Sequence, residues 1–310
     1  MVQSARKAPG PYAQAMPESS QIVLADGRRL TFDDVGDPHG VPLVYLHGTP
    51  DSRLARHPDD QLAASAGIRF LALDRPGAGT SDPHPGATLV SLGHDIAALL
   101  DHLGLRQTLM LGWSSGGLYA LAAATVLGDR VIGLGLVAPV PPIEAYRDPD
   151  LLAALAPGRR QFVELALGEP ASVIAAEVAP FLVPDSITPA AALDHVLEGA
   201  GERGRADLAE VPGAAEQLAR ALAASVQGGR GGLEHDIVLQ LEPGLDLSSI
   251  TAPVRTFHGG ADGLSPPLVG CWLVARLPRA VLDLSRDGSH HLMYPRWVGI
   301  LRSLRRDAGV

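Results

Sequence analysis

The chain has 310 residues, of which 46% are hydrophobic and 19% charged, so it can form one large domain with a sizeable core and is not a disordered chain. Its formal net charge of −9 argues against a nucleic-acid partner, because phosphate binding needs clustered lysines and arginines. The single cysteine, Cys271, excludes an internal disulfide, so nothing marks the protein as one from an oxidising compartment.

The N-terminal segment lacks the apolar core of a signal peptide, and we expect a flexible tail over residues 1–20. No stretch of the sequence approaches the ~18 consecutive apolar residues of a membrane-spanning helix. The sequence therefore predicts no membrane partner, and a cytoplasmic location is the default expectation.

Short apolar runs alternate with helical patterns from residue 21 to about residue 140. Two strands joined at Asp26-Gly27 predict a hairpin over 21–35. Further strands are expected at 43–46, 69–73, 109–111 and 131–137, and helices at 52–66, 89–103 and 118–127. This alternation predicts an α/β fold with a mostly parallel central sheet flanked by helices.

The alternation breaks at the proline-rich stretch 139–142. From there on we find only helical patterns, the clearest at 151–155, 161–167, 172–181, 189–197 and 214–226. Strands resume at 254–257 and 280–284, with helices at 266–277 and 296–306. The sequence therefore predicts a core formed by residues 21–140 and 246–310, and an inserted helical cap over 141–245.

A serine motif lies between an apolar strand and an Ala/Leu-rich helix. Gly112-Trp113-Ser114-Ser115-Gly116 fits the pattern G-x-S-x-G, and this strand–turn–helix context is the one that the motif requires. A serine on such a turn exposes its hydroxyl, and the start of the helix behind it favours negative charge. Ser114 is therefore the candidate nucleophile.

A serine hydroxyl needs a base to take its proton, and a carboxylate must orient that base. Asp262 follows the strand at 254–257, while His290 and His291 follow the last strand. The chain order Ser, Asp, His is that of the α/β-hydrolase arrangement. We favour His290 as the base because the small residues Gly288-Ser289 precede it directly, and His291 remains an alternative.

An acyl-transfer site also needs donors for the oxyanion. We expect these donors to be the backbone N–H of Ser115, which follows the nucleophile, and the backbone N–H of Thr49, after the strand at 43–46. His47, Gly48 and Trp113 are further candidates for the pocket.

Four groups of residues carry a resemblance to a known family. They are HGTP at 47–50, DRPGAGTS at 74–81, GWSSGG at 112–117, and HGGAD at 258–262 together with GSHH at 288–291. In these motifs the chain resembles the α/β-hydrolase fold superfamily, in the capped branch that includes proline iminopeptidase-like and epoxide-hydrolase-like enzymes. The resemblance implies a nucleophile, acid and base at Ser114, Asp262 and His290, and a cap of helices over them.

Two positions depart from the family pattern. Ser114 stands where epoxide hydrolases and haloalkane dehalogenases carry Asp, which argues against both activities, and Ser289 replaces the usual Gly before the histidine. The predicted function is a serine hydrolase that acts on a carboxylic ester, lactone or small amide and needs no metal or organic cofactor. Two alternatives stay open: a cyclase or acyltransferase with the same triad, and a non-catalytic ligand-binding homologue.

Overall fold

The computed structural model describes residues 19–310 except residue 243. The predicted tail therefore lies almost wholly outside the described residues. The last residue assigned to it, Ser20, opens the first strand.

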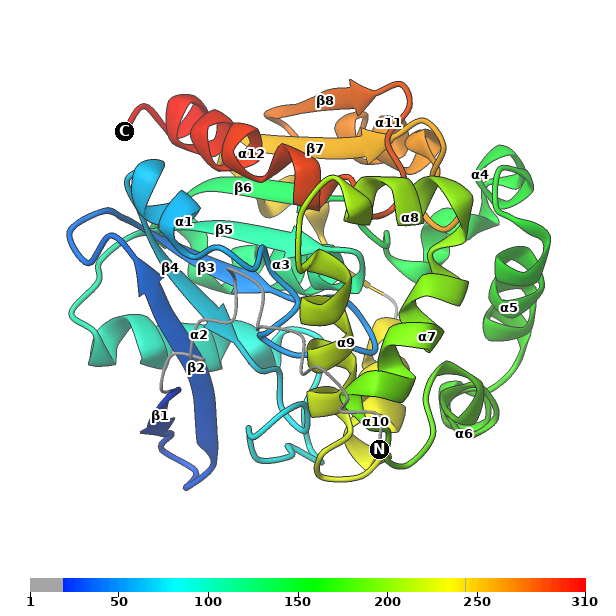
Figure 1. The fold of residues 1–310 in the computed structure, drawn as a ribbon. Coiled ribbons are helices and arrows are strands. Elements are labelled where there is room, and N and C mark those ends of the chain that lie inside the picture. The colour runs from blue at the N-terminus through cyan, green and yellow to red at the C-terminus, as the bar shows by residue number, and fades with distance from the viewer. Residues whose placement is uncertain (1–18, 243) are drawn as a thin grey trace, which may run out of the picture.

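One eight-stranded sheet forms the centre of the described chain, in the order β1-β2-β4-β3-β5-β6-β7-β8 (Figure 1). Its strands are β1 (Ser20–Val23), β2 (Arg29–Gly36), β3 (Val41–Leu46), β4 (Ile68–Leu73), β5 (Thr108–Trp113), β6 (Val131–Val137), β7 (Val254–Gly259) and β8 (Ala280–Ser285). The hairpin β1–β2 is antiparallel and β2 pairs antiparallel with β4, whereas all pairs from β4 to β8 are parallel.

Helices cover both faces of this sheet, and alternate residues of each strand face opposite layers. In β3, Val44 and Leu46 join the apolar cluster beneath α2 (Ser91–His102), α3 (Ser115–Leu127) and α11 (Pro267–Val274). Leu43 and Tyr45 join the cluster beneath α1 (Gln61–Ser65) and α12 (Met293–Ala308). The predicted α/β architecture, a mostly parallel sheet flanked by helices, is confirmed.

Seven α-helices occupy the described chain between β6 and β7, and Figure 1 shows them gathered on one side of the sheet. They are α4 (Pro149–Ala153), α5 (Pro157–Gly168), α6 (Ala171–Leu182), α7 (Pro189–Gly199), α8 (Gly201–Ala209), α9 (Ala214–Ser225) and α10 (Gly231–Gln240). None of the described helices is both long and apolar enough to cross a membrane. We refer to α4–α10 as the helical segment.

The structure corrects one predicted element of the core. The helix expected over 52–66 is reduced to α1, and the chain before it is irregular. In this loop the Arg53 and Arg56 side chains both reach the buried Asp33, at 2.7 and 2.8 Å, and Pro58 disfavours helical geometry in the residue before it. These ion pairs and the proline override the helical spacing of the apolar residues.

The sequence also failed to predict α8 and α10, each of which begins within a glycine cluster, at 199–204 and at 228–232. Most of these glycines lie at or beyond helix ends, where they cost less than in a helix interior. Gly204 lies inside α8 for a packing reason, since a Cβ there would come 2.9 Å from Nδ1 of His291. Because Gly204 has no Cβ, α8 can approach the histidine turn closely.

Candidate active site

Ser114 lies on a sharp turn between β5 and α3. It is one of two described non-glycine residues with positive φ, at φ 55° and ψ −125°, a conformation that costs on the order of 1–3 kcal/mol. The motif's glycines permit close backbone contacts: a Cβ on Gly112 would lie 2.3 Å from Gly116 O, and one on Gly116 would lie 2.1 Å from Leu46 O. The surrounding backbone thus fixes the turn and exposes the Ser114 hydroxyl to a cavity.

His290 follows β8 and contacts Asp262, which follows β7. His290 Nδ1 lies 2.8 Å from Asp262 Oδ2, and Asp262 Oδ1 accepts hydrogen bonds from the N–H groups of Leu264 and Ser265. Burial raises the pKa of Asp262, but His290 and these two donors outweigh it, so the pKa lies below its ordinary value. An ionised carboxylate here favours the tautomer with a proton on Nδ1 and leaves Nε2 of the ring free as a base.

The two histidines of the predicted alternative have different surroundings. Of the two, only His290 contacts Asp262. The His291 ring packs against Trp113, with ring centroids 5.8 Å apart, and against Gly204. Burial, with a contribution from His290, lowers the pKa of His291 to about 3. The arrangement therefore favours His290 over His291 as the base.

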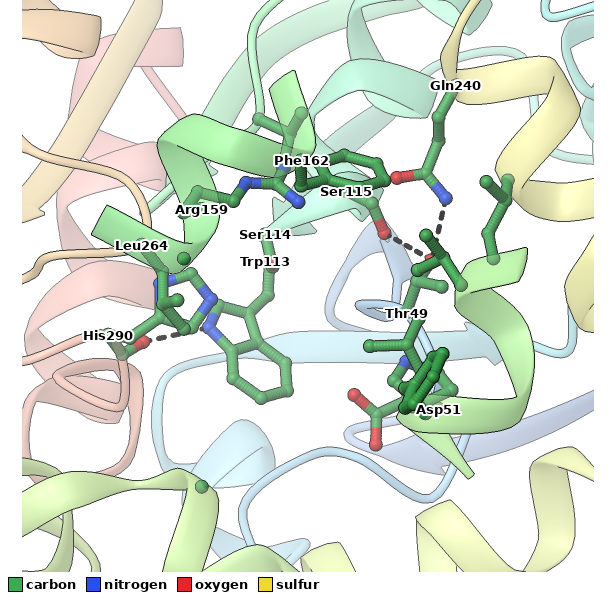
Figure 2. A pocket seen from close by; sticks show the side chains of 18 of the residues that line it. Thr49, Asp51, Trp113, Ser114, Ser115, Arg159, Phe162, Gln240, Leu264 and His290 are labelled. Carbon is green, nitrogen blue, oxygen red and sulfur yellow. Dashed lines mark hydrogen bonds between the residues drawn. The ribbon is translucent and has the colours of Figure 1, made fainter. Parts of the chain in front are cut away.

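Ser114 and His290 line the same cavity, and Figure 2 shows both beside the Trp113 ring. Trp113 Nε1 donates a hydrogen bond to the His290 carbonyl oxygen at 3.0 Å, which ties the nucleophile turn to the histidine turn. Among the described contacts there is no hydrogen bond between Ser114 Oγ and the His290 ring. Such bonds are often long without substrate and tighten in the complex.

Ser289, which departs from the family pattern, holds the histidine turn to the helical segment. Its N–H and Oγ donate to Oδ2 of the buried Asp207 on α8, at 2.8 and 2.6 Å. The same hydroxyl accepts a hydrogen bond from the His291 N–H at 3.0 Å. A glycine could not supply this hydroxyl, and the sequence carried no signal for Asp207, which is 82 residues away.

The two residues predicted to supply the oxyanion donors lie next to each other. Thr49 and Ser115 both line the cavity, and their side-chain hydroxyls are 2.7 Å apart (Figure 2). Ser115 is the first residue of α3, so its N–H has no acceptor within the helix. Within the described chain the Thr49 N–H also donates no hydrogen bond. Both N–H groups are therefore available to a ligand.

A buried ion pair fixes the loop that carries Thr49. Arg75, after β4, donates to both carboxylate oxygens of Asp236 on α10, at 3.0 and 2.8 Å, and to the carbonyl oxygens of His47 and Gly48. Thr49 Oγ1 donates to Asp236 at 2.5 Å and accepts from Arg75 at 2.8 Å. Arg75 therefore links the loop that carries Thr49 to α10.

The structure differs from the prediction at two of the three further pocket candidates. Trp113 lines the cavity, whereas His47 and Gly48 do not. The His47 ring is fully buried: Nδ1 donates to Gly48 O at 2.8 Å and Nε2 accepts from the Arg75 N–H at 3.2 Å. Gly48 lies behind the nucleophile, where a Cβ would come 3.3 Å from Cβ of Ser114. Both residues shape the loop rather than the cavity wall.

The cavity has a volume of about 530 Å³ and a mostly apolar wall, to which the core and the helical segment both contribute. Its apolar residues include Val140, Ile143, Phe162, Val178, Leu218 and Leu222. Asp51, Arg159 and Gln240 are among its polar residues, and Figure 2 shows them around Ser114. Across the described residues, no group of three or more His, Cys, Asp or Glu could hold a metal ion.

Asp51 provides a test of the cavity's electrostatics. Burial raises the pKa of Asp51 from 3.8 to about 7, although Arg75 and His290 oppose the change. Since burial disfavours the charged form, the carboxyl group destabilises the folded protein increasingly as the pH rises from about 4 to 7. We expect Asp51→Asn to raise the free energy of unfolding at pH 8 by at most about 4 kcal/mol, and to leave it unchanged at pH 4.

Urea unfolding at both pH values measures this effect. Asp287→Asn, at an exposed aspartate, is the matched control and should change the free energy of unfolding by less than ~0.5 kcal/mol. An equal effect of Asp51→Asn at pH 4 and pH 8 would show that its carboxyl group does not titrate in this range.

The fold and the site together define a class of α/β proteins, those with a serine turn, an aspartate and a histidine at the carboxyl edge of a mainly parallel sheet. The family model described as "alpha/beta hydrolase fold" matches residues 41–294. Since this match covers most of the chain, the protein belongs to the α/β-hydrolase fold family, as the sequence predicted.

Individual relatives match smaller parts of the chain. A non-heme chloroperoxidase from Streptomyces lividans is 36% identical over 156 residues, which are 46% of this chain and 56% of that protein. A proline iminopeptidase from Arabidopsis thaliana is 35% identical over 133 residues, 40% of this chain and 34% of that protein. The chain thus matches only about a third to just over half of these relatives' lengths.

A solved structure of an esterase from Thermogutta terrifontis superimposes with a TM-score of 0.63 at 22% identity, over 94% of this chain and 100% of that one. At this identity the likeness supports the shared fold alone.

Proposed function

We propose that this protein is a serine hydrolase that cleaves a carboxylic ester, lactone or small amide of a small-molecule substrate. The observation that carries the proposal is that Ser114, on its positive-φ turn, shares one cavity with His290, whose Nδ1 contacts the buried Asp262 at 2.8 Å. Nucleophile, base and orienting acid are the parts that acyl transfer to serine requires.

In this mechanism the His290 ring takes the proton of Ser114 as the hydroxyl attacks the substrate carbonyl. The N–H groups of Ser115 and Thr49 bind the oxyanion of the tetrahedral intermediate, and each such donor contributes about 3–4 kcal/mol to lowering the barrier. The protonated ring then gives its proton to the leaving group. In the second half-reaction His290 activates a water molecule, which releases the acid and regenerates Ser114.

The cavity favours a small and largely apolar acyl substrate. Its volume of about 530 Å³ falls within the range of small-molecule sites. The helical segment contributes much of the apolar wall, so substrate selection is expected to depend on α5, α6, α7 and α9 more than on the sheet. Names such as esterase and proline iminopeptidase among the similar proteins are consistent with this range of acyl substrates.

The direct test is covalent labelling combined with ester hydrolysis. We expect a fluorophosphonate probe to modify the folded protein at Ser114, because only an activated serine hydroxyl reacts rapidly with such a probe. The protein should also hydrolyse p-nitrophenyl acetate, butyrate or octanoate. Peptide mapping by mass spectrometry distinguishes Ser114 from its neighbour Ser115, and labelling of Ser115 or of neither serine would contradict the proposed role.

A further inference from the structure

Arg159 is a cation in the cavity with no acidic partner. It lies in the first turn of α5, lines the cavity, and stacks on Phe162 with its guanidinium carbon 4.8 Å from the ring centroid. Its Nε is buried without a hydrogen bond, and no described carboxylate forms an ion pair with it. Figure 2 shows the guanidinium on the side of the cavity above Ser114. A half-buried guanidinium on an apolar cavity wall, with no carboxylate beside it, is available to a ligand that carries negative charge.

Tyr146 supplies a second unpartnered donor near Arg159. It lines the same cavity, the residue is only 2% exposed, and its hydroxyl forms no hydrogen bond of ordinary geometry with the described residues. Burial raises the pKa of Tyr146, and the charge of Asp262 adds to this effect. The nearby Arg159 opposes it, by its charge and by the hydrogen bond that it can donate to the hydroxyl oxygen. The hydroxyl therefore stays protonated and can donate. Such buried, unsatisfied groups are uncommon in folded proteins. Two of them, both donors, line this part of the cavity.

The local backbone also favours an anion. Gly158 lines the cavity at the start of α5, where the helix has no side-chain cap and the N–H groups of Gly158 and Arg159 have no partner within the helix. A cation in the first turn opposes the helix dipole, so Arg159 is placed against the local electrostatic preference unless an anion lies between it and the helix end.

The acidic residues of the site do not neutralise Arg159. Asp262 is held by His290 and by the N–H groups of Leu264 and Ser265. Asp51 lies across Ser114 and Trp113 from Arg159 in Figure 2. Above pH 7, where Asp51 is mostly ionised, an anionic group on a bound molecule would therefore be repelled from the Asp51 side and attracted to the Arg159 side.

From these contacts we propose that Arg159 and Tyr146 form a carboxylate-binding subsite, and that the substrate carries a carboxylate in addition to its scissile acyl group. A planar carboxylate matches the fork of donors on a guanidinium and leaves an oxygen for the tyrosine hydroxyl. The single positive charge of Arg159 matches the single negative charge of one carboxylate. This inference rests on the proposed serine hydrolase and names the class of substrate for its site.

Matched esters test the proposal from both sides of the scissile bond. Mono-p-nitrophenyl adipate and p-nitrophenyl hexanoate differ by a carboxylate on the acyl side, and 4-carboxyphenyl butyrate and 4-carbamoylphenyl butyrate differ by one on the leaving side. In at least one pair we expect kcat/KM to be ten to a hundred times higher for the carboxylate. Arg159→Gln should remove this preference and Tyr146→Phe should reduce it. Arg147→Gln, at an exposed arginine beside Tyr146, should leave it unchanged.

Equilibrium binding to the Ser114→Ala protein gives a readout that needs no turnover. In at least one of the two pairs, we expect the ester with the carboxylate to bind at least tenfold more tightly than its neutral analogue. Arg159→Gln should abolish this difference in affinity. Equal binding within both pairs would overturn the subsite, even if the protein hydrolyses neutral esters and the serine hydrolase stands. Selective binding without turnover of any ester would retain the subsite and contradict the proposed function.

Discussion

Ser114→Ala is expected to lower kcat/KM for ester hydrolysis by at least ~10⁴-fold, and His290→Ala by a similar factor, because the nucleophile and its base act as one unit. The two losses should not multiply in the double variant, since removal of either partner already abolishes covalent catalysis. Steady-state rates with p-nitrophenyl butyrate measure the effect. Thermal melting shows that each variant is folded.

His291→Gln is the contrasting variant. His291 lines the cavity beside His290 but has no contact with Asp262, so we expect it to retain activity within about tenfold of wild type. If His291→Gln lost as much activity as His290→Ala, the role of the base would have to be assigned to His291. Survival of activity in Ser114→Ala would remove the nucleophile assignment altogether.

The nucleophile turn was predictable because its signal is local. G-x-S-x-G between an apolar strand and a helix specifies the backbone geometry within five residues, and the glycine spacing reflects the contacts that Gly112 and Gly116 make. The candidate acid and base could be proposed from chain order, because the carboxyl ends of parallel strands meet at one edge of the sheet. The Asp262–His290 contact joins residues that are only 28 positions apart.

The residues that support the site were not predictable, since their partners are distant in sequence. Asp207 reaches Ser289 across 82 residues, and Asp236 reaches Arg75 across 161. Both aspartates lie on helices that follow glycine clusters, and the sequence pattern gave no helix at either place. Tertiary contacts of this kind override local propensity. A single sequence does not show which distant charged residues will form ion pairs.

Arg75→Met is expected to lower the free energy of unfolding by about 3–5 kcal/mol. The substitution keeps much of the apolar volume but leaves the carboxylate of Asp236 mostly buried without its cation, which is the costly way to break a buried ion pair. Removing both charges in Arg75→Met/Asp236→Leu should recover much of this loss. Urea unfolding of the wild type, the single variant and the double variant measures these free energies. The matched control is Arg69→Met, which breaks the more exposed pair with Asp34 and should cost less than ~1 kcal/mol.

The same variants separate stability from positioning. Arg75 also donates to the carbonyl oxygens of His47 and Gly48 and to Thr49 Oγ1, so it holds the loop whose N–H is the expected oxyanion donor. The double variant should therefore regain stability while kcat stays at least about tenfold below wild type, since a misplaced donor weakens transition-state binding. If kcat recovers together with stability, Arg75 matters only as a partner for Asp236. If Arg75→Met costs no more stability than Arg69→Met, the ion pair does not hold α10 to the core.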